Sequence, residues 1–173
     1  MVYFTADFHF GHENIIQYCD RPFKNAAKMD EWMTRGYNEV VKPEDTVYIL
    51  GDFTLCGVEA TERVGKWVKK LNGRKHLILG NHDRLKPFVY VDLGFCSVHT
   101  GLDWPRSNLA LIHDPAVKVA LPKERRVLCG HVHTLFQCLE GVVNVGVDKW
   151  FFRPVSIPEI EKLIGPINLG LES

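Results

Sequence analysis

The chain has 173 residues, 46% of them apolar, which is enough for a single domain over residues 1–173 and excludes a disordered chain. Its 21 Lys and Arg residues balance 21 Asp and Glu residues, so no overall charge draws it to nucleic acid or to a membrane surface. No apolar run reaches the length of a membrane span, and the N-terminus has no signal-peptide pattern. Five scattered cysteines without a C-x-x-C pair favour a reducing, cytoplasmic location.

Strands and helices are predicted to alternate in the first half of the chain. Three apolar runs predict strands that each lead into polar residues: 2–6, 46–50 and 75–79. Apolar residues at helical spacing predict two helices between them: 29–41 and 64–71. Residues 8–27 predict a loop that contains a short helix, with Arg21-Pro22 as its breaker.

The second half of the chain is richer in predicted strands. Four further runs predict them: 95–100, 108–112, 126–129 and 142–147. A last short helix is predicted over residues 158–164, and no repeat or linker divides the chain. The order of elements alone therefore predicts an α/β fold with a strand-rich second half.

Polar side chains of a few kinds follow these strands. They lie in five short motifs: Asp7-Phe8-His9, Gly51-Asp52, Gly80-Asn81-His82-Asp83, His113-Asp114 and Gly130-His131-Val132-His133. Taken singly, each Asp is a turn or cap residue and each His is a partly buried ring with a satisfied hydrogen bond. Taken together, carboxylates, imidazoles and a carboxamide oxygen are what borderline divalent ions such as Mn²⁺, Fe²⁺ and Zn²⁺ accept. They are too many for one tetrahedral ion.

The spacing within two of the motifs favours a shared site. Asp7 and His9 are two residues apart, as are His131 and His133, so on a continuing strand each pair would share a face. Two metals about 3.5–4 Å apart need a bridging group, which an Asp carboxylate can supply. Such a pair binds a phosphate and turns a bridging water into hydroxide at neutral pH, which fits in-line attack on a phosphate ester.

In this order, the motifs D-x-H, G-D, G-N-H-D, a later His and G-H-x-H resemble the calcineurin-like metallophosphoesterase family, from Asp7 to His133. The short spacing is similar to that of its small single-domain prokaryotic and phage members. The segments Phe10–Ile16, Asn144–Asp148 and Arg153–Ser156 resemble one subgroup of these. The resemblance implies a four-layer αββα sandwich of two mixed β-sheets flanked by helices.

The resemblance also implies a role for each motif residue. One metal would be held by four residues: Asp7, His9, Asp52 and His133. The other would share the bridging carboxylate with three more: Asp52, Asn81, His113 and His131. His82 would steady the phosphate and donate a proton to the leaving oxygen, while Asp83 would orient His82 or hold the loop.

Four other features have alternative interpretations. His12 could reach the phosphate or a base, and Arg21 could hold a second phosphate or a leaving group, although most such residues are ordinary surface side chains. The aromatic segments Trp104-Pro105 and Trp150-Phe151-Phe152 could stack a base, cover the core or form a homodimer contact. We favour the core or the dimer for these aromatics.

We therefore expect a metal-dependent phosphoesterase that activates a bridging hydroxide with two divalent ions. Mn²⁺ is the favoured ion, with Fe, Zn, Ni or Co as alternatives. Because no long lid is evident, we prefer phosphodiesters of nucleotides or nucleic-acid ends as substrates, with phosphomonoesters as the alternative that His82 leaves open. Two rival hypotheses are a protein-interaction scaffold, which the complete ligand set opposes, and a nucleic-acid processing module that acts only in a complex.

Overall fold

The structure is a computed structural model that describes residues 1–55, 61–104, 107–122 and 125–167. The described residues form two mixed sheets of five strands each. The strands of the first sheet, in spatial order, are β10 (Val155–Ser156), β1 (Val2–Thr5), β2 (Thr46–Leu50), β3 (Arg74–Ile78) and β4 (Ser97–His99). Those of the second are β5 (Leu102–Asp103), β6 (Leu109–Leu111), β7 (Arg126–Cys129), β9 (Val142–Asn144) and β8 (Cys138–Leu139).

Parallel strands make up the centre of each sheet. In the first sheet β1 to β4 run parallel and β10 pairs antiparallel with β1. In the second, β6, β7 and β9 run parallel, and β5 and β8 close the two edges antiparallel. Parallel neighbours need crossover connections, which the helices supply in the first half of the chain.

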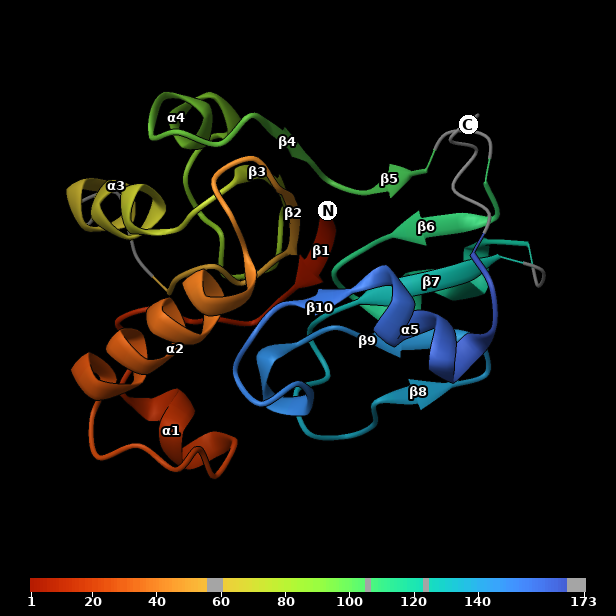
Figure 1. Ribbon diagram of the computed structural model, residues 1–173, viewed down its shortest axis with the longest axis horizontal. Helices are drawn as coiled ribbons and strands as arrows, with labels where there is room; N and C mark the ends of the chain where they lie inside the picture. The colour runs from red at the N-terminus through yellow and green to blue at the C-terminus, as the bar shows by residue number, and fades with distance from the viewer. Residues whose placement is uncertain (56–60, 105–106, 123–124, 168–173) are drawn as a thin grey trace.

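Some of the helices cover the first sheet on its outer face. The α-helices of the described chain are α1 (Asn14–Tyr18), α2 (Ala26–Val40), α3 (Thr61–Lys70), α4 (Pro87–Asp92) and α5 (Ile157–Ile164). Figure 1 shows α2 and α3 to one side of the first sheet and the second sheet on its other side. Met33 and Tyr37 of α2 and Val68 of α3 pack with Ile49 and Leu77 of the sheet, and all are fully or almost fully buried.

A second core fills the space between the two sheets. Phe4, Leu50 and Ile78 of the first sheet pack there against Leu111 and Leu128 of the second. A smaller cluster of buried apolar residues lies on the outer face of the second sheet. The 3₁₀ helix η2 (Pro115–Ala120) and the loop after β7 lie beside it. The expected sandwich of two mixed sheets with flanking helices is thus confirmed.

The two sheets meet at the carboxyl ends of β1 and β9. Ala6 forms a parallel bridge with Gly146, and the Val147 N–H donates to the Ala6 carbonyl at 3.1 Å. Gly130, directly after β7, also lies against this junction, where a Cβ would stand 2.6 Å from the Ala6 Cβ and 2.8 Å from the Leu50 oxygen. Only glycine fits at this position, so the two sheets lie close together beside the polar motifs.

Several predicted boundaries change in the structure. The strand predicted over 142–147 ends at Asn144, and the 3₁₀ helix η3 (Val147–Lys149) follows it. The strand predicted over 95–100 is shortened to β4. The helix α4 and the two-residue strands at the sheet edges were not predicted, because segments this short carry too few residues to show a period.

The aromatic segments lie in different places. Trp150 is buried in the core between the sheets, and Trp104 packs against the same core. Phe152 packs against the outer core of the first sheet, whereas Phe151 is 84% exposed. Pro105 lies outside the described residues. The preference for a core role is therefore confirmed for Trp150, Trp104 and Phe152.

Among the described residues, no helix combines the length and apolar character that crossing a membrane requires.

Gly130→Ala tests the close approach of the sheets. We expect a loss of about 1–3 kcal/mol in the free energy of unfolding, because the added methyl meets the Ala6 Cβ and the Leu50 carbonyl oxygen, both held in place by the strands. Urea unfolding of both proteins measures the difference. Gly36→Ala inside α2 is the matched control and should be neutral or stabilising, since its Cβ meets nothing closer than 3.4 Å. Equal stability of Gly130→Ala and the parent protein would contradict the packing described.

Candidate metal centre

The polar motifs converge where parallel strands of both sheets end. The loops after β1 and β2 remain paired beyond the sheet, through the Asp7 N–H to the Gly51 carbonyl and the His9 N–H to the Asp52 carbonyl, each at 3.0 Å. The loop after β7 joins them, because the His131 N–H donates to both carboxylate oxygens of Asp7 at 2.9 and 3.0 Å. Residues far apart in the sequence are thereby brought to one edge of the fold.

The backbone at this edge turns in the left-handed region. Five motif residues have positive φ: Asp7 (59°), His9 (52°), Asp52 (52°), His131 (70°) and His133 (45°). Asp and His tolerate this region better than most residues, but each position still costs about 1–3 kcal/mol. The expectation that a continuing strand aligns each i, i+2 pair was wrong, because β1 ends at Thr5 and β7 at Cys129. Left-handed turns bring the pairs to the site instead.

Two groups of donor atoms form within this edge. The first consists of Asp7, His9 and His133, whose donor atoms all lie within 4.8 Å of one another. The second consists of Asp52, His113 and His131, under the same limit.

Asn81 belongs beside the second group. Its Oδ1 lies 3.0 Å from both the His113 Nε2 and the His131 Nδ1. The structure thus brings together all seven residues expected to hold metal.

Asp52 lies between the two groups. Its Oδ2 is 3.5 Å from the His9 Nε2 and 3.4 Å from the His113 Nε2. Its Oδ1 accepts a hydrogen bond from the His82 N–H at 2.9 Å, which leaves Oδ2 as the oxygen that faces both groups. The Asp52 side chain is only 2% exposed. One carboxylate oxygen therefore reaches donors of both groups, as a bridging ligand must.

The donor set fits divalent metal ions. Both ring nitrogens of His9 are buried and have no hydrogen-bond partner among the described residues, an arrangement that is costly unless another group satisfies them. Burial lowers the pKa of His9 to about 3, so the ring is neutral and carries the lone pair that a metal needs. Imidazole, carboxylate and amide donors without a thiolate in either group suit Mn²⁺, Fe²⁺ or Zn²⁺.

Charge is tightly coupled within the second group. Burial raises the pKa of Asp52, but the His113 hydrogen bond and charge outweigh it and lower that pKa to about 2. Burial likewise lowers the pKa of His113, and its contact with Asp52 outweighs this and raises it to about 9. An ionised Asp52 carboxylate is therefore available to bind a cation at this position. In the first group, burial raises the pKa of Asp7 to about 6.

Further contacts orient the histidines. The His113 Nδ1 donates to the Leu50 carbonyl at 2.8 Å, which turns its Nε2 toward Asp52 and Asn81. The His133 Nδ1 lies 3.0 Å from the Asp148 Oδ2. Carboxylates and carbonyls that accept from the outer ring nitrogen are typical supports of metal-binding histidines.

Arg21 supports the site from behind. Its guanidinium donates to the two Asp148 oxygens at 2.7 and 2.9 Å, and to the carbonyls of Asp7 and Phe8 at 2.8 and 3.0 Å. The Arg21 side chain is 0% exposed, so a substrate cannot reach it in this structure. Arg21, for which a substrate contact and an ordinary surface position were the two alternatives, is therefore buried, and it positions Asp148 and, through it, His133.

The contact between Arg21 and Asp148 was not predicted, because 127 residues separate them in the sequence. The only sequence signal was the placement of Asp148 in a segment that resembles the subgroup. Cys19 was also not singled out, although its Sγ, the Asp148 carboxylate and a His133 nitrogen lie within 4.8 Å of one another.

His82 and Asp83 have separate surroundings. The His82 ring lies 5.3 Å from the His9 ring between centroids, and its side chain is 33% exposed. Asp83 accepts from the backbone N–H groups of Asp52, Phe53 and Gly80 at 2.8, 3.1 and 2.9 Å. Asp83 was expected either to orient His82 or to hold the loop. Its hydrogen bonds are those of a residue that holds the loops.

Two hollows open beside the centre. One, of about 420 Å³, has His9, His12, His82, His131 and His133 among its lining residues. The other, of about 330 Å³, is lined by residues that include Asn81, His113 and His131. His131 lines both hollows, so they flank the candidate metal centre.

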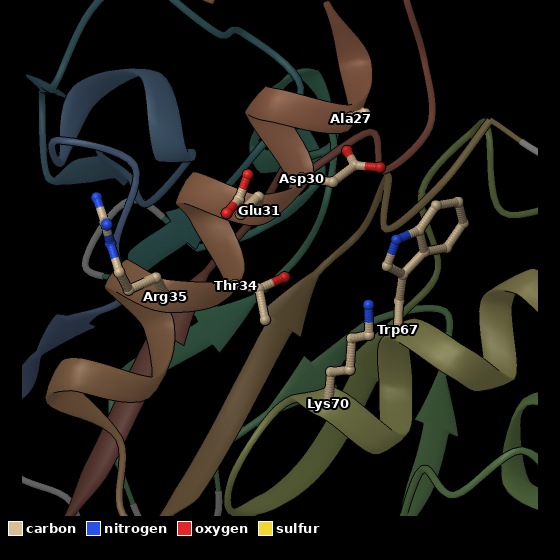
Figure 2. A pocket seen from close by; sticks show the side chains of 7 residues that line it. All are labelled: Ala27, Asp30, Glu31, Thr34, Arg35, Trp67 and Lys70. Carbon is tan, nitrogen blue, oxygen red and sulfur yellow. The ribbon is translucent and has the colours of Figure 1, made fainter.

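A third hollow lies away from the strand ends, between α2 and α3 (Figure 2). Its lining mixes charges of both signs with Trp67 and includes no residue of the two donor groups. Asp30 on its wall accepts the Gly11 N–H at 3.1 Å, and burial raises the pKa of Asp30 to about 6. Its contact with Gly11 ties α2 to the loop that carries His9 and His12.

Asp148→Asn tests the buried ion pair. Because the change leaves the Arg21 charge buried without its partner, we expect a loss of about 3–5 kcal/mol in the free energy of unfolding. Urea unfolding at neutral pH measures it. Glu31→Gln, which breaks the exposed pair with Lys28, is the control and should change stability little. A small effect of Asp148→Asn would show that Arg21 finds other compensation.

Comparisons with known proteins relate the chain to a family and to several small proteins. The chain matches the family model described as calcineurin-like phosphoesterase over residues 1–153. It is 31% identical over 170 residues to the uncharacterized protein MJ1445 of Methanocaldococcus jannaschii, covering 94% of this chain and 90% of that protein. It is 29% identical over 201 residues to the gene 66 protein of Mycobacterium phage D29, covering 98% of each.

A solved structure has a similar fold. The crystal structure of AQ665 from Aquifex aeolicus, a protein of unknown function, matches with a TM-score of 0.71 and 29% identity. The match covers 94% of this chain and 98% of that one. The small archaeal and phage relatives agree with the resemblance noted from the sequence. Because the family model spans most of the chain and the two donor groups lie within it, the chain belongs to the calcineurin-like phosphoesterases, a family of metal-dependent hydrolases of phosphoesters.

Proposed function

We propose that this protein hydrolyses phosphodiesters at a centre of two divalent metal ions bridged by Asp52. The observation that supports this most directly is the position of the Asp52 Oδ2, within 3.5 Å of nitrogens in both donor groups. Membership of the family supports the broader activity, hydrolysis of phosphoesters. The bridging carboxylate extends it to a two-metal mechanism.

The proposed ligands divide into two sets that share Asp52. One set is Asp7, His9, Asp52 and His133, and the other is Asp52, Asn81, His113 and His131. Two divalent ions held there, with Mn²⁺ favoured, would supply Lewis acidity and a nucleophilic hydroxide at neutral pH. The residues of the chain fix the ligand directions in advance, through the contacts of His113 with Leu50 and of His133 with Asp148.

His82 is the proposed proton donor. It lies at the rim of the larger hollow, and its Nε2 is 4.0 Å from the Asp52 Oδ2. Its backbone is anchored to Asp52, while its ring is one-third exposed and can face a bound phosphate. A histidine in this place can protonate the leaving oxygen and neutralise the charge that develops there. Asp83 holds the loops through backbone N–H groups.

The two flanking hollows favour a diester over a monoester. A phosphodiester has two organic substituents, and the hollows of about 420 and 330 Å³ offer space on both sides of the centre. A monoester would leave one of them without a substrate group. Monoester hydrolysis is the second candidate, because the exposed His82 suits the protonation of poor leaving groups.

The cytoplasmic location and the homodimer expected from the sequence remain predictions.

Hydrolysis of bis-p-nitrophenyl phosphate tests the proposal. Metal-stripped protein should be inactive, and added Mn²⁺ should restore cleavage by at least about 100-fold. The diester should be cleaved with a higher kcat/KM than p-nitrophenyl phosphate under the same conditions. Absorbance of released p-nitrophenol gives both rates, and manganese content is measured on the same samples.

The variant Asp52→Asn isolates the bridge. It should lose both manganese content and activity, because the shared ligand loses its charge, while Asp92→Asn on α4 should keep both. Near-normal turnover by Asp52→Asn would remove Asp52 from the bridging role. A higher kcat/KM for the monoester would assign the protein to the phosphatases. No turnover of either ester by metal-loaded protein would favour a scaffold or a partner-dependent enzyme.

His82→Ala separates proton donation from metal binding. The variant should keep its manganese and lose about 10²–10⁴-fold in rate for esters with poor leaving groups. The loss should shrink as the leaving alcohol becomes more acidic, since a good leaving group needs no proton. A series of aryl and alkyl esters measures this dependence. A uniform loss across the series would make His82 a phosphate-binding residue instead.

A further inference from the structure

The larger hollow beside the candidate metal centre has a mixed lining. Five imidazoles line it, and three of them (His9, His131 and His133) belong to the donor groups. The rest of its lining is mostly apolar: Ile15, Tyr18, Cys19, Val132 and Leu135. Its volume of about 420 Å³ lies within the range of small-molecule sites, roughly 300–1,000 Å³.

Two large side chains of this lining are exposed to solvent. Tyr18, the last residue of α1, is 73% exposed, and Leu135, in the loop after β7, is 79% exposed. Packing of the core does not account for either. They come from segments more than a hundred residues apart, yet both line the hollow beside the candidate metals. Large exposed apolar groups gathered at one hollow are typical of a binding surface.

A row of rings leads from the centre to Tyr18. The His9 ring lies 5.7 Å from the His12 ring, and the His12 ring lies 6.3 Å from the Tyr18 ring, between centroids. His9 belongs to the first donor group, so a substituent on a phosphate bound there would extend along this row. Tyr18 offers a flat face at the end of the row, where a second flat group can stack.

Among the described residues, the lining offers no Lys or Arg to a second anionic group. The nearby Arg21 is fully buried in its ion pair. A polyphosphate, or a nucleic-acid strand that follows a groove, would need such cations. The hollow therefore suits one uncharged aromatic substituent next to a single phosphate.

We propose that this hollow is a subsite for the base of a nucleoside phosphate, with Tyr18 as the stacking surface and Leu135 as the facing wall. A nucleoside joined to one phosphate supplies such a group, because its flat, uncharged base is separated from the phosphate only by a sugar. This inference rests on the proposed function and narrows its substrate class. His12 becomes a side wall of the subsite, which agrees with the expectation that it could reach a base.

Binding of thymidine 5′-phosphate and of ethyl phosphate to manganese-loaded protein tests the subsite without turnover. The two ligands carry the same phosphate monoester and differ in the nucleoside. Calorimetry should show thymidine 5′-phosphate bound about tenfold more tightly, the gain expected of one stacked base. Tyr18→Ala should remove this preference and leave ethyl phosphate binding unchanged, whereas Tyr18→Phe should retain it.

Phe88→Ala is the matched control, since Phe88 is a 62% exposed aromatic residue on α4 that does not line the hollow. It should keep the preference for the nucleotide. Equal binding of the two ligands by the parent protein, or a preference that survives in Tyr18→Ala, would overturn the subsite.

Failure of the subsite and failure of the proposed function give different results. Manganese-dependent cleavage of bis-p-nitrophenyl phosphate without any nucleotide preference removes the subsite and keeps the activity. A nucleotide preference that depends on Tyr18 in a protein that cleaves no ester supports the subsite and removes the activity.

Discussion

The buried Arg21 guanidinium connects the parts of the chain that the candidate centre needs. It binds the Asp148 carboxylate and the carbonyls of Asp7 and Phe8, all within 3.0 Å. The Asp7 and Phe8 carbonyls lie beyond β1, and Arg21 satisfies both of them. Asp148 in turn orients His133, so one cation links the loop after β1 to the loop after β7. A buried ion pair is costly to desolvate, and its contribution here is the fixed geometry of the site.

A second constraint is the way in which the strands end. Strained left-handed residues that persist in a folded chain are held there by surrounding contacts, and they gather at functional sites. Here the contacts are plain: both Asp7 oxygens accept from the His131 N–H, and Asp83 accepts from the loops after β2 and β3. Gly130 lets the loop after β7 come close enough for the first of these. The left-handed residues thus lower the stability of the fold, but they hold the side chains of the site in position before a ligand binds.

The amino-acid sequence predicted much of the fold and many of the residues of the candidate centre. The apolar runs predicted β1, β2, β3 and β7 to within one residue at each end, since buried parallel strands are short and continuous in their hydrophobicity. The motif residues were gathered correctly, but for the wrong geometric reason, because spacing cannot distinguish a continuing strand from a left-handed turn. Arg21 was considered as a substrate contact or as an ordinary surface residue, and its buried role was missed because its partner Asp148 lies 127 residues away in the sequence. The two-residue strands were missed because they form through pairing with a neighbouring strand, which their own residues do not reveal.

The parallel arrangement of β6, β7 and β9 also has a consequence for the opposite rim of the fold. There the amino ends of the strands begin from short connections, such as the turn at Glu140 and Gly141 between β8 and β9, in which both residues have positive φ. No residue of the two donor groups is drawn from that turn. Loop tips of this kind tolerate added sequence. Evolution or protein engineering could therefore insert a segment at this turn without disturbing the candidate metal centre at the other end of the strands.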